Sequence, residues 1–173
     1  VLQKGRVVQT FSGKVGIREL RIKDGKVLEL NGKPIKFRGV TSHATDPVRV
    51  KVIGEELTLK DMKLMKEASI NYLRTSHYPR EPRFYELADS LGFYIVNEVP
   101  FASRGEKHLK KPSYYDILRT RTKATIDRDK NHASVMIWSL GNENPLPESC
   151  QRIGEYAKSL DTTRMICYPQ KGS

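Results

Sequence analysis

Polar side chains that can do acid–base chemistry follow four separate apolar runs of the sequence. In chain order they are His43 and Asp46, Ser76 to Tyr78, Asn97 and Glu98, and Asn142 and Glu143. In a parallel α/β fold the C-terminal ends of the strands meet at one rim, where ligands bind. The spacing therefore predicts a site that combines imidazole, carboxylate and amide groups.

Glu143 is the sharpest candidate for a catalytic group. It follows an apolar run that contains the only tryptophan, Trp138, and we expect its surroundings to leave it partly desolvated. Such an environment raises the pKa of a carboxyl toward the value that a general acid needs. The neighbouring Asn142 is suited to hold a substrate hydroxyl. The residues alone leave open that Glu143 caps the helix starting near Pro147, or is merely exposed.

Glu98 and the two histidines admit other roles. Glu98 is expected either at the site or in a buried ion pair with an arginine such as Arg38 or Arg74. His43 and His77 lack the spacing of metal ligands, and the sequence contains neither HExxH nor CxxC, so we predict polar contacts to a substrate rather than a zinc site. His132 is expected to be structural, at the opposite end of the strands, and His108 to face solvent.

Nucleophilic hydrolysis by serine or cysteine is not supported. No Gly-x-Ser-x-Gly motif occurs, and Ser76 and His77 are adjacent in sequence rather than opposed in space. Cys150 and Cys167 have no evident base partner.

The elements that must position these groups alternate in type. Strands are predicted over 15–22, 26–30, 36–40, 69–74, 93–96, 135–140 and 165–168, and helices from Thr58, over 82–91, 114–128 and 147–160. Asn31-Gly32 is a strong hairpin signal, Thr58 with Asp61 resembles a capping box, and Pro82 and Gly92 suit a helix start and stop. Alternating strands and helices predict an α/β fold with parallel strands.

Two architectures fit this order: a doubly wound sheet, or the first half of a TIM (β/α)8 barrel. No glycine-rich phosphate loop follows the first barrel-type strand, and the sequence stops just after the fifth. We therefore favour half a barrel.

Composition excludes some partners. The 173 residues carry a net charge of +11, but the basic residues are spread along the chain instead of forming the stripe that nucleic-acid binding requires. No apolar run is long enough to cross a membrane. The sequence begins with Val1 and shows no leader, so we expect a processed or truncated chain. Its localisation is unsettled.

Four motifs closely resemble glycoside hydrolase family 2, which includes β-galactosidases, β-glucuronidases and β-mannosidases. They are residues 30–40, RTSHYP at 74–79, RDKNH at 128–132 and WSLGNE at 138–143. The resemblance runs from about Gly16 to Tyr168. It implies that residues 1–20 end an immunoglobulin-like β-sandwich domain and that 21–173 form the N-terminal half of a (β/α)8 catalytic barrel.

The resemblance also implies a retaining exo-β-glycosidase that uses two glutamates and no cofactor. Glu143 matches the acid/base, Asn142 the amide that contacts the sugar 2-hydroxyl, and His77 and His43 histidines of the substrate pocket. Glu98 matches a carboxylate at the end of the third strand, which is expected among the substrate-binding residues. The family's nucleophile would lie beyond Ser173, so this chain alone is expected to be inactive.

A departure from the family pattern after the third strand affects the expected substrate. Metal-dependent β-galactosidases carry a Glu-x-His pair where this sequence has Ala102 and Arg104, so we expect no magnesium site there. Glu98-Val99-Pro100 is similar to the glucuronidase branch, and Arg104 is suited either to an anionic sugar or to a surface salt bridge.

We therefore expect a β-galactoside first and a β-glucuronide second, with a non-catalytic carbohydrate-binding relative as the alternative of another class. The expected partners are an oligosaccharide or glycoconjugate substrate, the rest of the barrel and another copy of the chain, with no nucleic acid and no membrane.

Overall fold

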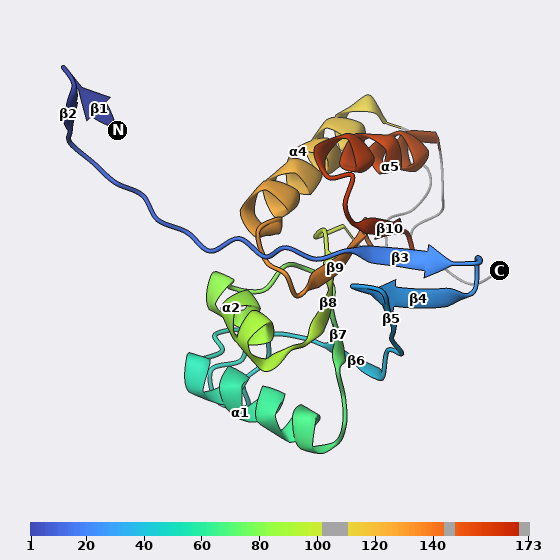
Figure 1. Ribbon diagram of the computed structural model, residues 1–173. Coiled ribbons are helices and arrows are strands. Elements are labelled where there is room, and N and C mark those ends of the chain that lie inside the picture. The colour runs from blue at the N-terminus through green and yellow to red at the C-terminus, as the bar shows by residue number, and fades with distance from the viewer. Residues whose placement is uncertain (102–110, 144–147, 170–173) are drawn as a thin grey trace.

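A computed structural model describes residues 1–101, 111–143 and 148–169. Its centre is a five-stranded parallel sheet in the order β10-β9-β8-β7-β6 (Figure 1). The strands are β6 (Gly39–Ser42), β7 (Tyr72–Thr75), β8 (Tyr94–Glu98), β9 (Val135–Ser139) and β10 (Met165–Cys167). Spatial order follows chain order without reversal, which is the topology of a barrel wall and not of a doubly wound sheet. The predicted α/β half-barrel is confirmed.

One helix connects each pair of neighbouring strands where the connection is described. The helices are α1 (Glu55–Glu67), α2 (Pro82–Leu91), α4 (Pro112–Asp129) and α5 (Glu148–Leu160). Pro82 occupies the first turn of α2, and Gly92 ends it with a left-handed φ of 70°, as predicted. Within the described ranges, no helix combines the length and apolar character that crossing a bilayer requires.

Two local predictions are wrong at helix ends. Thr58 is not a cap, because α1 begins three residues earlier and the Thr58 hydroxyl donates back to the carbonyl of Gly54 at 3.1 Å. The strand predicted from residue 69 starts at Tyr72. Ser69 instead closes α1 with a φ of 60°, and the amide of Ile70 bonds to the carbonyl of Met65, the pattern of a Schellman motif.

The first 38 residues lie outside the parallel sheet. β1 (Leu2–Gln3) and β2 (Arg6–Val7) form an exposed hairpin, which Figure 1 shows away from the sheet on an extended segment. β3 (Leu20–Lys23), β4 (Val27–Leu30) and β5 (Lys33–Pro34) form an antiparallel sheet. The predicted Asn31-Gly32 hairpin turn joins β4 to β5, with both residues at positive φ.

The segments predicted as strands over 15–22 and 36–40 are strands only in part. The amide of Gly16 donates to the carbonyl of Asn131 at 2.8 Å, and a side chain at Gly16 would lie 2.3 Å from the Cβ of Ala133. The Asn71 side chain bonds to the carbonyl of Lys36 and the amide of Arg38. Both segments therefore lie against the N-terminal end of the parallel strands.

The core fills the space between the sheet and the helices. Its largest completely buried side chains include Trp138, Tyr85, Phe93 and Ile153. Burial of apolar groups of this size is the main stabilising contribution to such a layer.

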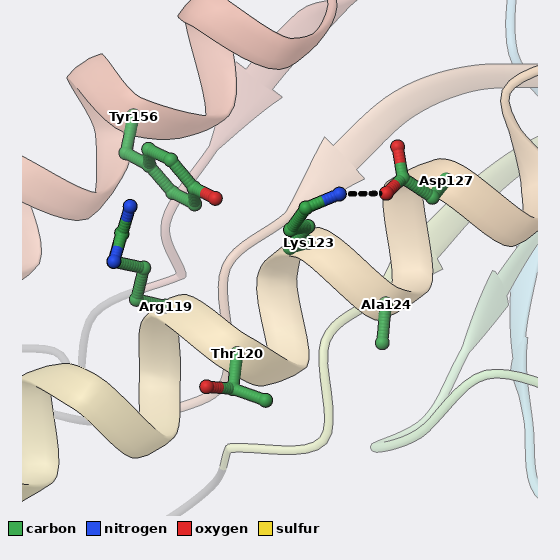
Figure 2. A pocket seen from close by; sticks show the side chains of 6 residues that line it. All are labelled: Arg119, Thr120, Lys123, Ala124, Asp127 and Tyr156. Atoms are coloured by element: carbon green, nitrogen blue, oxygen red, sulfur yellow. Dashed lines mark hydrogen bonds and ion pairs between the residues drawn. The ribbon is translucent and has the colours of Figure 1, made fainter.

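On the outer surface, α4 and α5 are joined by two reciprocal cation–π contacts. The guanidinium of Arg119 on α4 lies 4.8 Å from the ring centre of Tyr156 on α5, and Arg152 on α5 lies 4.3 Å from that of Tyr115 on α4. Figure 2 shows the first contact beside a surface hollow, along with the exposed Lys123–Asp127 ion pair. These stacked pairs fix the two helices against each other.

A buried ion pair between Asp161 and Arg164 lies near the start of β9. Asp161 accepts hydrogen bonds from Trp138 Nε1 at 2.8 Å and from Arg164 Nη1 at 2.7 Å. Arg164 also donates to the carbonyls of Lys130, His132 and Val135. Burial alone would raise the pKa of Asp161, but the hydrogen bonds from Thr163, Arg164 and Trp138 outweigh it and hold the pKa well below its usual range.

We predict that Asp161→Asn lowers the stability of this domain by about 3 kcal/mol, because it leaves the buried charge of Arg164 unpaired. A depressed carboxyl pKa stabilises the fold above the unfolded pKa of about 4 and loses that contribution as the pH falls further. Thermal melts should therefore show the gap between wild type and variant narrowing below pH 4. The exposed Asp127→Asn is the control and should leave the melting temperature unchanged.

Candidate active site

The predicted site residues lie at the C-terminal ends of β6 to β9. Parallel pairing sets Thr41 opposite Arg74, Arg74 opposite Val96 and Glu98 opposite Ser139. The turns that follow the strands therefore open onto the same rim, where His43, His77, Glu98, Asn142 and Glu143 are found.

Glu98 is the centre of this rim and is completely buried. Its Oε2 accepts Nε and Nη2 of Arg74, at 2.8 and 2.6 Å, and the hydroxyl of Ser139 at 3.0 Å. Its Oε1 lies 2.7 Å from Nδ1 of His77. Both carboxylate oxygens are thus occupied by protein donors, as a buried charge requires. Of the two arginines expected as partners, Arg74 makes the pair, whereas Arg38 lies at the opposite end of the strands.

Arg74 links Glu98 to Asn142. Its Nη2 also donates to Oδ1 of Asn142 at 2.7 Å. Because a guanidinium only donates, this bond fixes the amide of the buried Asn142 with its Oδ1 toward Arg74. Its Nδ2–H has no partner among the residues that the structure describes. The backbone amide of Asn142 donates to the carbonyl of Phe101 at 2.9 Å.

His77 and His43 form the next part of the rim. An ionised carboxylate only accepts, so the proton between His77 and Glu98 belongs to Nδ1, and a neutral His77 presents Nε2 as an acceptor. His43 packs edge-on against His77, with ring centres 5.4 Å apart. Desolvation is the largest cause that lowers the pKa of His43, and its interactions with His77, Lys51 and Arg80 act in the same direction. A lowered pKa favours the neutral form of the His43 imidazole.

Glu143 lies in the turn that follows β9. Its φ is 50°, and its backbone amide donates to the carbonyl of Pro169 at 3.0 Å. The expectation that its surroundings desolvate it is wrong for this chain, because the side chain is exposed. Leu140, Gly141 and Asn142 of the same turn are buried, so Glu143 is its exposed residue.

Other predicted residues fall outside the rim. His132 contacts Asp89 at 2.6 Å near the start of β9, as expected for a structural residue. Ala102, Arg104 and His108 lie outside the described residues. Across 1–101, 111–143 and 148–169, no three histidine, cysteine or acidic side chains gather as metal ligands would.

The structure adds two groups that the sequence patterns did not single out. Ser139, in the strand itself, bonds to Glu98. Cys167, opposite Ser139 on β10, has its thiol pKa raised by burial. A small polar residue inside an apolar strand gives no signal of which neighbour it faces.

This fold and rim belong to a known class of hydrolases. Residues 20–173 match the model for the TIM barrel domain of glycosyl hydrolases family 2. The chain belongs to that family.

Two similar curated proteins are β-galactosidases. The chain is 37% identical to a β-galactosidase of Lactococcus lactis over 170 residues and 38% identical to one of Streptococcus thermophilus over 180, matching 96% and 97% of this chain. It spans only 17% of the length of each.

Among solved structures, a β-glucuronidase of Bifidobacterium dentium, complexed with coumarin-3-O-glucuronide, superposes with a TM-score of 0.84 at 27% identity. That match covers 92% of this chain and 27% of the other. A β-D-glucuronidase of Dictyoglomus thermophilum superposes at 0.83 and 29% identity, covering 91% and 30%.

We predict that Arg74→Met costs about 3 to 5 kcal/mol of stability, because it removes the main charge partner of a completely buried carboxylate. Adding Glu98→Met should recover more than half of that loss, since the unpaired charge is then gone. Thermal melts of the two variants measure this. Arg83→Met, which removes two exposed ion pairs, is the control. A double variant less stable than Arg74→Met would contradict the account.

Proposed function

We propose that this chain carries the acid/base residue of a retaining exo-β-glycosidase, and that this residue is Glu143. The observation that carries the proposal is the bond between Arg74 and Asn142, which fixes an amide donor on the residue next to Glu143. A glycosidase needs a proton donor and a group that binds the sugar beside it. Family membership supports this assignment.

The reaction would take place in two steps. A protonated Glu143 gives its proton to the glycosidic oxygen as the leaving group departs, while a second carboxylate, about 5 to 5.5 Å away, attacks the anomeric carbon. We propose that residues outside these 173 supply this nucleophile. Glu143 then takes a proton from water, and the hydroxide formed releases the sugar from the enzyme.

The remaining rim residues would hold the sugar. Asn142 Nδ2–H would donate to the 2-hydroxyl, and His77 Nε2 would accept a further hydroxyl, with His43 beside it. Glu98 is completely buried and would act through Arg74 and His77 rather than by contact. We therefore propose a positioning role for Glu98 in place of the substrate contact that the resemblance implied.

A terminal β-galactoside, in an oligosaccharide or glycoconjugate, is the proposed substrate. It is favoured by the names of the curated relatives, which share 37% and 38% identity with the chain. A β-glucuronide is the second candidate. It is supported by the superposition on two β-glucuronidases and by the positive charges of Lys51 and Arg80 near His43.

The start of the family match supports a domain division, and the two edge strands of the parallel sheet suggest partners. We propose that residues 1–20 end a β-sandwich domain and that 21–173 form half of the barrel, since the family match begins at residue 20. Among the described residues, β6 and β10 each pair on one side only. Further strands of a closed barrel are the proposed partners of these edges, and a second copy of the chain is a further proposed partner.

The test is Glu143→Gln in the full-length protein that contains these residues. We expect kcat to fall by roughly 10²- to 10⁴-fold with sugar binding retained, because the variant cannot transfer a proton. The exposed Glu148→Gln, at the start of α5, is the matched control and should keep full activity. A wild type that binds sugars without turnover would support the non-catalytic alternative.

The choice of sugar is tested separately, with nitrophenyl β-galactoside and nitrophenyl β-glucuronide as substrates of the wild-type protein. We expect the galactoside to be hydrolysed faster. Hydrolysis of the glucuronide alone would reverse the order of the two candidates.

A further inference from the structure

Ser139 is the last residue of β9 and lies between the buried charges and the turn that bears Glu143. Its side chain is completely buried. Its hydroxyl is 3.0 Å from Oε2 of Glu98 and 3.2 Å from the carbonyl oxygen of Gly141. A serine hydroxyl has one hydrogen, so these two acceptors share it in a three-centre bond.

The turn from Leu140 to Glu143 is otherwise held by its backbone amides. Leu140 donates to the carbonyl of Cys167 at 3.0 Å, Asn142 to that of Phe101 at 2.9 Å, and Glu143 to that of Pro169 at 3.0 Å. These bonds join the turn to the last residue of β10 and to the segments that follow β8 and β10. The Ser139 hydroxyl, which contacts both the carbonyl of Gly141 and Oε2 of Glu98, joins the turn to the buried Glu98 carboxylate.

Arg74 makes a second connection between Glu98 and the turn, through the side chain of Asn142. It joins the same Oε2 of Glu98 to Oδ1 of Asn142. One oxygen of Glu98 is therefore linked to the turn twice, once through the amide of Asn142 and once through the backbone before it. Because both connections start at the same buried oxygen, they hold the orientation of the turn relative to Glu98 as well as its distance from Glu98.

We propose that Ser139 is a positioning residue, which orients the turn so that Glu143 meets the leaving-group oxygen while Asn142 holds the sugar. This inference rests on the proposed function. Ser139 touches neither substrate nor the reacting atoms, and its effect passes through Glu98 and the carbonyl of Gly141. Loss of its hydroxyl leaves the Arg74–Glu98 ion pair in place, so the fold is kept while the turn is released.

Leaving-group dependence separates this role from a general loss of structure. A methyl glycoside departs only with full proton donation, whereas a 2,4-dinitrophenolate is stable enough to leave without it. Misplacement of Glu143 therefore slows the first substrate and spares bond cleavage in the second. Damage to folding or sugar binding slows both alike.

The experiment compares Ser139→Ala with wild type in the full-length protein, using methyl and 2,4-dinitrophenyl β-galactosides, or the matching glucuronides if the wild type prefers them. We expect kcat/KM to fall roughly tenfold to a hundredfold for the methyl glycoside and less than about threefold for the dinitrophenyl glycoside. Ser134→Ala is the matched control. Ser134 is a buried serine just before β9, and its hydroxyl has no partner among the described residues. It should change neither value.

Equal losses on both substrates, or no loss on either, would overturn the positioning role of Ser139 while leaving the proposed function standing. A wild type inactive on every glycoside would overturn the proposed function and this inference with it. If Ser139→Ala does not fold, the isosteric pair Ser139→Thr and Ser139→Val repeats the comparison. The same selective loss is then expected for the valine variant alone.

Discussion

A carboxylate that water cannot reach must receive its hydrogen bonds from the protein, and this requirement organises the rim around Glu98. Its donors come from the strands on either side: Arg74 and His77 from β7 and its end, and Ser139 from β9. Each donor has a further connection, Arg74 to Asn142, Ser139 to the carbonyl of Gly141, and His77 to the ring of His43. Satisfying one buried charge therefore fixes the positions of the groups proposed to hold the sugar.

The two ends of the parallel sheet use buried charge for different purposes. At the N-terminal end, the donors of Arg164 are taken up by Asp161 and backbone carbonyls, and Trp138 bonds to the same carboxylate. This arrangement joins the loop before β10 to the start of β9. At the C-terminal end, Glu98 and Arg74 hold His77 and Asn142 through Nδ1 and Oδ1, and His77 Nε2 and Asn142 Nδ2–H have no partner among the described residues. This difference matches the division of barrel folds into a stabilising face and a catalytic face.

Much of the fold could be predicted from residues with strong local conformational preferences. Pro82 and Gly92 bound a helix, and Asn31-Gly32 needs positive φ at both positions. The rule that polar groups gather at strand ends located the turns of His43, His77 and Asn142. The separate expectation that a buried Glu98 would pair with an arginine included Arg74 as one of two examples. The start of β7 was predicted too early, because the closing turn of α1 uses residues 69 and 70. The exposure of Glu143 depends on which segments surround it, and the contact of Ser139 depends on strand register. Neither the exposure of Glu143 nor the contact of Ser139 can be predicted from the neighbouring residues in the sequence.

The most direct test of the central claim is a crystal structure of the full-length protein with an unhydrolysed β-glycoside bound. The account predicts that the Glu143 carboxyl lies within hydrogen-bond distance of the glycosidic oxygen while Asn142 Nδ2 contacts the 2-hydroxyl and still accepts Arg74 through Oδ1. A sugar bound away from the ends of β6 to β9, or a Glu143 side chain turned away from the glycosidic oxygen, would contradict it.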